Sequence, residues 1–202
     1  MNSHLLNVLE ITRMQDETTD RWHRLVPPLP PPSATLPDLV IAQHRANFDL
    51  WHEEDKARDP GASDSEIASV KRSIDRLNQY RNDLIEKIDL QLISVLEDVM
   101  RPSSDAPLHS ETPGMMIDRL SILALKIFHT REQAERTDAG DAHRQKNTER
   151  LEILLEQRSD LAVALDALLR DAAEGHRRFK LYRQMKMYND PELNPVIYKH
   201  KG

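Results

Sequence analysis

The sequence contains no cysteine, few glycines and no long apolar run, and each absence excludes a class of structures. Without cysteine the chain forms no disulfide, has no thiolate nucleophile and cannot bind zinc through sulfur, which suits a reducing compartment. Only five glycines occur among 202 residues, so tight turns are scarce and long helices are favoured. No apolar stretch approaches the roughly 18 residues of a membrane-spanning helix, and no secretory signal is recognisable. We therefore expect a soluble, cytoplasmic, helical protein without a transmembrane segment.

Charge is abundant but unevenly distributed. Charged residues make up 31% of the chain, which is typical of long, solvent-exposed helices. The net charge is −6, yet residues 176–202 contain seven Lys and Arg against two acids and carry +5, which leaves −11 for the rest. This acidic body argues against binding to nucleic acid. The basic tail is expected either to fold back on the acidic body or to contact an anionic surface.

Five helices are predicted, with limits set by prolines and capping residues. Six prolines between Pro27 and Pro37 exclude a helix there, because proline lacks an N–H donor and keeps its predecessor extended. Thr112 followed by Pro113 marks a capped helix start, and MMIDRLSILALKIF after it is apolar on nearly every face, as in a buried helix. The predicted helices span residues 2–23, 38–58, 65–100, 113–136 and 141–178.

These elements divide the chain into an N-terminal helix, a proline-rich connector, a bundle and a tail. The respective limits are residues 1–25, 26–37, 38–178 and 179–202, and the bundle consists of antiparallel hairpins in residues 38–100 and 112–178. Each hairpin alone would expose an apolar stripe, which packing the two together would bury. The predicted fold is therefore an all-α four-helix bundle with an additional N-terminal helix.

Shifting the sequence by 77 residues places the second hairpin on the first. His52 then falls on His129, Arg81 falls on Arg158, and the two turns inside the hairpins coincide. We interpret this offset as an internal repeat. The alternative is coincidence, because helical periodicity aligns any two amphipathic helices to some extent.

Polar side chains occupy positions of the second predicted helix that should face another helix. His44, Asn47, Trp51, Glu54 and Arg58 follow steps of three and four residues and so share one face, yet four of these five are polar. Such a face indicates either a network of internal hydrogen bonds and ion pairs or a polar pocket.

Arg81 interrupts the apolar seam of the third predicted helix, and Arg158 does the same in the fifth. Buried charge is costly unless paired, so one interpretation is an internal ion pair of Arg81 with Glu54 or Asp55, and of Arg158 with an acid of the fourth helix. The other interpretation is a pocket inside the bundle that binds a phosphorylated or otherwise anionic small molecule.

No glycine-rich phosphate loop, serine nucleophile elbow or HExxH zinc motif occurs. The Glu-x-x-His pattern of di-iron bundles is also absent, so no cofactor is firmly implied and a divalent metal remains open. The loop Ser110–Gly114 either holds an anion on its amides or simply begins a capped helix. No catalytic residue is assigned. The candidate ligand pocket comprises His44, Asn47, Trp51, His52, Glu54, Asp55, Arg58, Arg81, Asn82, Glu86, Glu111, Asp118 and His129.

Three segments resemble a bacterial family of about 200-residue helical proteins that is catalogued only as a domain of unknown function. They are HRANFDLWHEEDKAR (residues 44–58), IDRLNQYRNDLIEKID (74–89) and SETPGMMIDRLSILALKIFH (110–129), which carry the motifs LWHxEDxAR and SETPGxxIDRLSIL. The resemblance runs from about residue 40 to the C-terminus. It implies no activity, and at most an association with synthesis of cell-envelope polysaccharide.

Two functions follow as expectations. The first is a non-enzymatic accessory protein that interacts with a protein partner or forms a homo-oligomer, in connection with envelope polysaccharide synthesis. The alternative is an enzyme or binding protein for a phosphorylated small molecule, with a polar pocket that is open to a metal. The sequence leaves open whether the protein is an enzyme.

Overall fold

The computed structural model describes residues 7–28, 35–99, 105–185 and 190–199. These residues form helices and connecting segments and contain no strand beyond one isolated bridge, so the predicted all-α class is confirmed. The helices are α1 (Val8–Arg24), α2 (Leu36–Lys56), α3 (Asp64–Val99), α4 (Pro113–Glu135), α5 (Asp141–Ala173) and the short α6 (Pro195–Tyr198).

Local sequence explains where the helices begin. At α3 the backbone N–H of Ser63 donates to Glu66 at 2.8 Å, and the N–H of Glu66 donates back to Ser63 Oγ at 3.4 Å, which is a capping box. At α4 Thr112 Oγ1 accepts from the N–H of Met115 at 3.2 Å, as predicted for a capping threonine. The sequence prediction started α2 after Pro37, whereas the helix includes it, because proline is tolerated in a first turn whose N–H groups have no helical partner.

The end of α5 differs from the prediction. The helix stops at Ala173 rather than at residue 178, and Gly175 adopts a positive φ of 75°. His176 N donates to Asp171 O at 2.8 Å and Gly175 N donates to Ala172 O at 3.1 Å, which is the hydrogen-bond pattern of a Schellman cap. The chain beyond this cap is extended.

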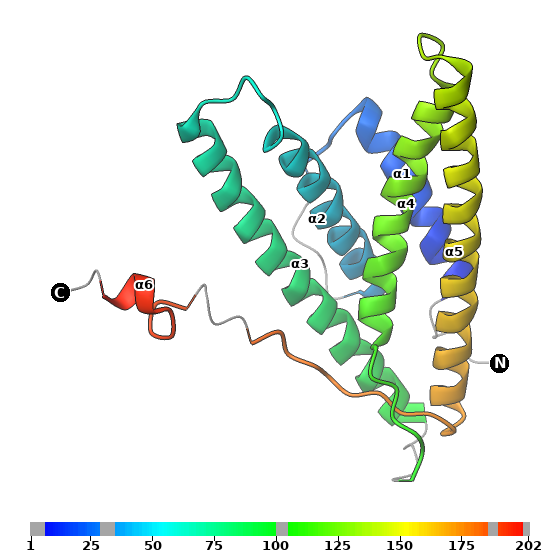
Figure 1. The fold of residues 1–202 in the computed structure, drawn as a ribbon. Coiled ribbons are helices and arrows are strands. Elements are labelled where there is room, and N and C mark those ends of the chain that lie inside the picture. Colours follow the sequence, from blue (N-terminus) through cyan, green and yellow to red (C-terminus); the bar gives the residue numbers. More distant parts are fainter. Residues whose placement is uncertain (1–6, 29–34, 100–104, 186–189, 200–202) are drawn as a thin grey trace.

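The helices pack as a bundle of two hairpins with α1 against them. Figure 1 shows the α2–α3 hairpin leaning away from the α4–α5 hairpin, with the two closest where α3 ends and α4 begins. Helix α1 contacts α4, α2 and α5, whereas α3 contacts α4 directly. The predicted bundle is therefore present in its general form, and α1 belongs to it.

The apolar seams of the hairpins are buried to different depths along their length. Leu84 and Ile88 of α3 and Leu165 of α5, near the junction, are each fully buried. Towards the turns, Leu77 and Leu154 are only partly buried, whereas Ile74 is still buried. Leu84, Ile88 and Leu165 belong to the larger hydrophobic cluster, and a second cluster is formed by Trp22, Phe48 and Leu125.

The tail runs back across the body. Arg178 forms a parallel bridge with Leu108, in which Arg178 N donates to Pro107 O and His109 N donates to Arg178 O. Further along, Gln184 N donates to the Glu86 carboxylate at 3.2 Å. The start of the first predicted helix, most of the proline-rich connector and parts of the tail lie outside the described residues.

Candidate ligand-binding cleft

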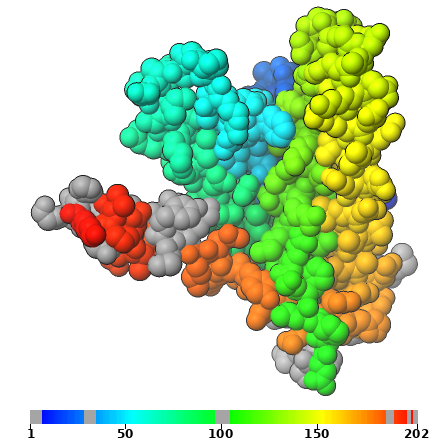
Figure 2. Space-filling view, in the orientation of Figure 1, coloured from blue at the N-terminus to red at the C-terminus, as the bar shows by residue number. Residues whose placement is uncertain are grey.

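A cleft of about 300 Å³ lies between α2, α3 and α4, on the side where the hairpins diverge. Figure 2 shows the surface hollowed between the upper parts of the two hairpins. The cleft is lined by Asn47, Leu50, Trp51, Glu54, Asp55, Arg58, Asn78, Arg81, Ile122 and Leu125. Its apolar lining comes from three aliphatic side chains and one tryptophan, and the other six residues are polar or charged.

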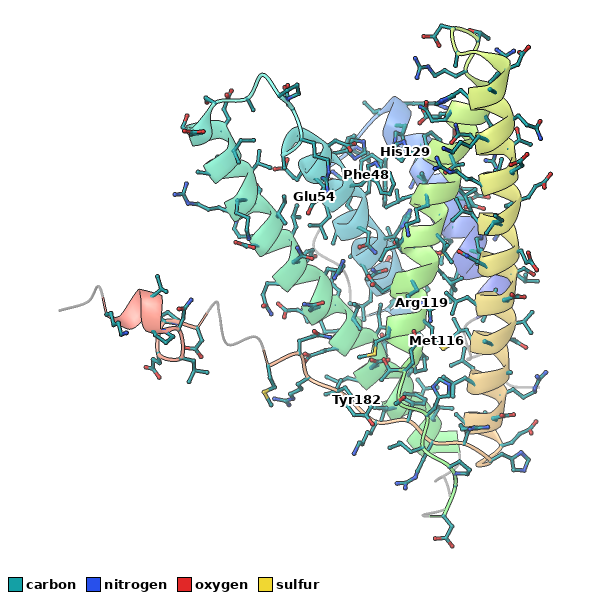
Figure 3. All side chains as sticks on the ribbon, in the orientation of Figure 1. Phe48, Glu54, Met116, Arg119, His129 and Tyr182 are labelled. Carbon is teal, nitrogen blue, oxygen red and sulfur yellow. The ribbon has the colours of Figure 1, made fainter. Side chains whose placement is uncertain are left out.

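One wall is the polar face of α2. Asn47, Trp51, Glu54 and Arg58 are spaced by three or four residues, so the helical repeat turns all four towards the cleft. Glu54 and Arg58 form an ion pair at 2.7 Å near the exposed end. Figure 3 labels Glu54 close to the upper end of α2, at the level of Phe48 and of His129 on α4.

Arg81 of α3 contributes a half-buried cation to the cleft. Among the described residues, its side chain makes two polar contacts, and both are long: Nη1 to Asn47 Oδ1 at 3.5 Å and Nε to Asp118 Oδ1 at 3.7 Å. Nε is buried and has no hydrogen bond. The predicted ion pair of Arg81 with Glu54 or Asp55 is wrong, because the carboxylate nearest the guanidinium belongs to α4.

Arg158, which occupies the corresponding position in α5, is fully paired. Its Nη1 and Nη2 each donate to a different oxygen of Asp16 at 2.6 Å. This partner lies on α1, so the expected pairing with an acid of the fourth helix is also wrong. Arg158 thus forms two short hydrogen bonds to one carboxylate, whereas Arg81 makes two long contacts.

Beneath the cleft, a chain of polar side chains crosses the interior. Asp118 accepts from Gln43 and from Asn47 Nδ2, the latter at 2.9 Å. Asn47 Nδ2 also donates to Ser121 Oγ at 2.9 Å, and Ser121 Oγ lies 2.7 Å from His44 Nδ1. His44 Nε2 lies 2.9 Å from the Thr19 hydroxyl on α1, so the chain connects three helices.

Burial shifts the pKa values of two groups in this chain, His44 and Asp118. His44 is 1% exposed, and desolvation lowers its pKa to about 3, against a weaker opposing hydrogen bond to Gln15 O. Desolvation also raises the pKa of Asp118, although Arg81 and the amides of Asn47 and Gln43 oppose the rise. His44 is therefore a neutral structural group near pH 7 and does not reach the cleft.

Three histidines, His23, His52 and His129, lie close together beside Trp51. Trp51 stacks on His129 with ring centroids 4.7 Å apart, and the His23 ring lies 5.3 Å from His52 and 4.9 Å from His129. Burial lowers the pKa of His129, while its contact with Glu132 opposes this. Within the described part of the chain, no three His, Asp or Glu side chains gather in a way that could hold a metal ion.

The structure separates the remaining predicted pocket residues from the cleft. His52 points to another hollow between α1, α2 and α3, and its Nδ1 lies 2.8 Å from Phe48 O. Asn82 is buried in α3 without lining the cleft, Glu86 holds the tail, and Glu111 pairs with Arg119 at 2.7 Å. The sequence interpretation had placed all of these in one pocket.

The structure also adds residues that the sequence interpretation missed. Thr19, Gln43 and Ser121 all take part in the polar chain. Ser121 could have been noticed in the sequence, since it is an uncharged polar residue within the apolar stretch MMIDRLSILALKIF of the helix that begins at Pro113. The role of Thr19 could not be predicted, because the sequence does not show which helices α1 packs against.

The start of α4 is closed to an external anion by the protein itself. The Asp89 carboxylate accepts from the Gly114 N–H at 2.7 Å and from the Thr112 hydroxyl. Desolvation raises the pKa of Asp89 to about 6, although both hydrogen bonds oppose the rise. The loop Ser110–Gly114 thus begins a capped helix, as one of the two interpretations held.

The fold and the cleft together define an all-helical protein with a polar cleft between two hairpins. The chain belongs to the DUF4254 family, described as a protein of unknown function, with residues 37–181 matching it. This confirms the predicted membership in a family known only as a domain of unknown function. No curated protein and no solved structure matches the chain. In the described residues no helix is long and apolar enough to span a membrane.

Proposed function

We propose that the protein binds a small phosphorylated molecule in the cleft, with Arg81 holding the phosphate. The observation that carries this proposal is the incomplete coordination of Arg81, whose nearest acceptors are 3.5 and 3.7 Å away and whose Nε is buried without a hydrogen bond. A buried donor left unsatisfied costs about 1–3 kcal/mol. A phosphate oxygen entering the cleft would supply charge-assisted hydrogen bonds to the Nη atoms, because the Arg81 side chain is 25% exposed and its Nε is the enclosed atom.

The other cleft residues restrict the rest of the ligand. Trp51 has one ring face against His129, and it also lines the cleft, where it offers apolar surface to a ring or carbon chain. Glu54 and Asp55 accept hydrogen bonds and would repel further negative charge, whereas the Asn78 amide both donates and accepts. We infer a ligand with one phosphate near Arg81 and hydroxyl or amine donors nearer the mouth.

The proposal concerns binding and includes no catalytic step. The acid–base candidate His44 is enclosed by Thr19 and Ser121, and Asp118 is covered by three donors. Both groups support the floor of the cleft without reaching a molecule inside it.

Titration with inorganic phosphate and with simple phosphorylated compounds, followed by tryptophan fluorescence, tests the proposal because Trp51 lines the cleft. Arg81→Met is expected to weaken binding by tenfold or more, since a charge-assisted pair contributes about 1.5–3 kcal/mol. Arg76→Met is the matched control, because Arg76 lies on α3, donates to Ser73 at 3.0 Å and lines another hollow. Equal affinities of the two variants would overturn the proposal.

The stability of Arg81→Met separates the two interpretations of this arginine. Asp118 keeps its hydrogen bonds from Gln43 and Asn47, so unfolding free energy should fall by only about 1–2 kcal/mol. Loss of a tight internal ion pair would cost about 3–5 kcal/mol instead. Urea denaturation of both arginine variants measures the difference.

We further infer that the two hairpins are copies of one ancestral hairpin. Residues separated by 77 positions meet across α2 and α4: His44 bonds to Ser121, and the rings of His52 and His129 lie 6.2 Å apart. Such contacts support an approximate twofold relation between the hairpins. Roles as an accessory protein, as a homo-oligomer or in envelope polysaccharide synthesis remain predictions from the sequence.

A further inference from the structure

We propose that Thr19 and His44, which line no part of the cleft, are positioning residues of the anion site: they fix the Asn47 amide so that its oxygen faces Arg81. The inference rests on the proposed function and assigns α1 a part in it. It follows from the direction in which each hydrogen bond of the buried chain must run.

Thr19 on α1 determines which group donates in each hydrogen bond of the buried chain. The Thr19 hydroxyl lies 2.7 Å from Gln15 O, and since a carbonyl can only accept, its proton is used there. Thr19 Oγ1 therefore accepts from His44 Nε2, which must carry the ring proton. His44 Nδ1 is then an acceptor, and the Ser121 hydroxyl donates to it.

The same constraint continues to the cleft. Because the Ser121 proton is used on His44, Ser121 Oγ accepts from Asn47 Nδ2 at 2.9 Å. The second Nδ2 proton goes to Asp118 Oδ1, also at 2.9 Å. Asn47 Oδ1 is thereby turned to Arg81 Nη1. A flipped amide would place donors against the guanidinium and an acceptor against Asp118, losing all three contacts.

Burial prevents water from replacing the partners in these hydrogen bonds. Thr19 and His44 are each 1% exposed, Ser121 is 0% exposed and Asn47 is 4% exposed. In such surroundings donors aligned in one sense reinforce one another. The family match begins at residue 37, yet the last acceptors of the chain, Thr19 and Gln15, belong to α1. Helix α1 is thus a structural component of the anion site.

The phosphate titration tests this with Thr19→Val, which keeps the shape and removes the hydroxyl. Loss of the acceptor for His44 should weaken phosphate binding about fivefold. Thr19→Ser restores the hydroxyl and should restore affinity to within twofold. Thr18→Val is the matched control, because Thr18 is buried on the same helix and donates only to Met14 O and Gln15 O. Unchanged affinity in Thr19→Val, or an equal loss in Thr18→Val, would overturn the inference.

A measurement without phosphate distinguishes this inference from the proposed function. Nitrogen NMR of the full-length protein should show His44 protonated at Nε2, and the Asn47 side-chain amide signals should shift in Thr19→Val but not in Thr18→Val. If these shifts occur while wild-type protein fails to bind phosphate, the proposed function fails and the positioning stands. If the Asn47 signals are the same in Thr19→Val and wild type, the positioning is wrong whatever the protein binds.

Discussion

At the scale of single residues, His44 links the interior to the pH of the solution. Its ring is enclosed, stacks on Trp22 with centroids 5.2 Å apart, and has both nitrogens in hydrogen bonds. Adding a proton would put a donor at Nδ1 against the Ser121 hydroxyl and a charge in an interior that water does not reach. Burial therefore lowers the pKa of His44 from 6.5 to about 3.

This shift predicts acid sensitivity. Between about pH 6.5 and 3 the unfolded chain binds a proton at His44 that the folded chain does not, so stability is fully present above this window and falls as pH decreases through it. The expected slope from this group is about 1.4 kcal/mol per pH unit. His44→Gln should show a shallower fall in unfolding free energy between pH 6 and pH 4, measured by urea denaturation. Parallel pH profiles for the two proteins would contradict this.

The polar residues of α2 also show how far sequence reasoning reaches. Helical spacing predicted that Asn47, Trp51, Glu54 and Arg58 share a face, and all four line the cleft. The partner of Arg81 could not be predicted, because periodicity identifies the inward face of a helix but not the helix that it meets. Asp118 was recognised as a pocket candidate without its pairing to Arg81.

At the scale of the elements, the start of α4 fixes the distance between the two hairpins. A methyl group built on Gly114 would lie 2.8 Å from Ile85 O and 2.8 Å from Asp89 Oδ1. The first of these atoms is backbone of α3 and cannot rotate away. The absence of a side chain at Gly114 therefore allows α3 and α4 to meet at the closed end of the molecule.

Gly114→Ala is accordingly expected to lower the free energy of unfolding by about 1–3 kcal/mol, the usual cost of overpacking. Gly140→Ser is the control, because no atom lies within 4 Å of a side chain at this position and serine is favoured as the N-cap of α5. Thermal denaturation should show a lowered midpoint for the first variant and an unchanged or slightly raised midpoint for the second. A neutral Gly114→Ala would show that the helices can separate without cost.

Helix limits were predicted to within a few residues where capping chemistry defines them. Thr112 and Pro113 fixed the start of α4, whereas the predicted α5 ran past Gly175 because the left-handed cap there was not recognised. The packing of α1 could not be predicted. Its buried face mixes Val8, Ile11 and Trp22 with Thr12, Gln15, Thr18 and Thr19, and this pattern shows which side of the helix turns inward but not which helices it meets.

At the scale of the whole molecule, the cleft exists because α1 covers only one side of the two hairpins. On one side α1 contacts α2, α4 and α5 and provides Asp16 as the partner of Arg158. On the other side the hairpins diverge, and Arg81 of α3 is left with two long contacts beside the open cleft. We therefore expect a small molecule to pair with Arg81 as Asp16 of α1 pairs with Arg158.

Native mass spectrometry of the protein purified from its own host, with phosphorus determined on the same sample, measures this occupancy directly. Wild-type protein and Arg76→Met should carry a small phosphorylated molecule, and Arg81→Met prepared in parallel should lack it. Wild-type protein free of any such molecule, or an equal amount bound to Arg81→Met, would contradict the account.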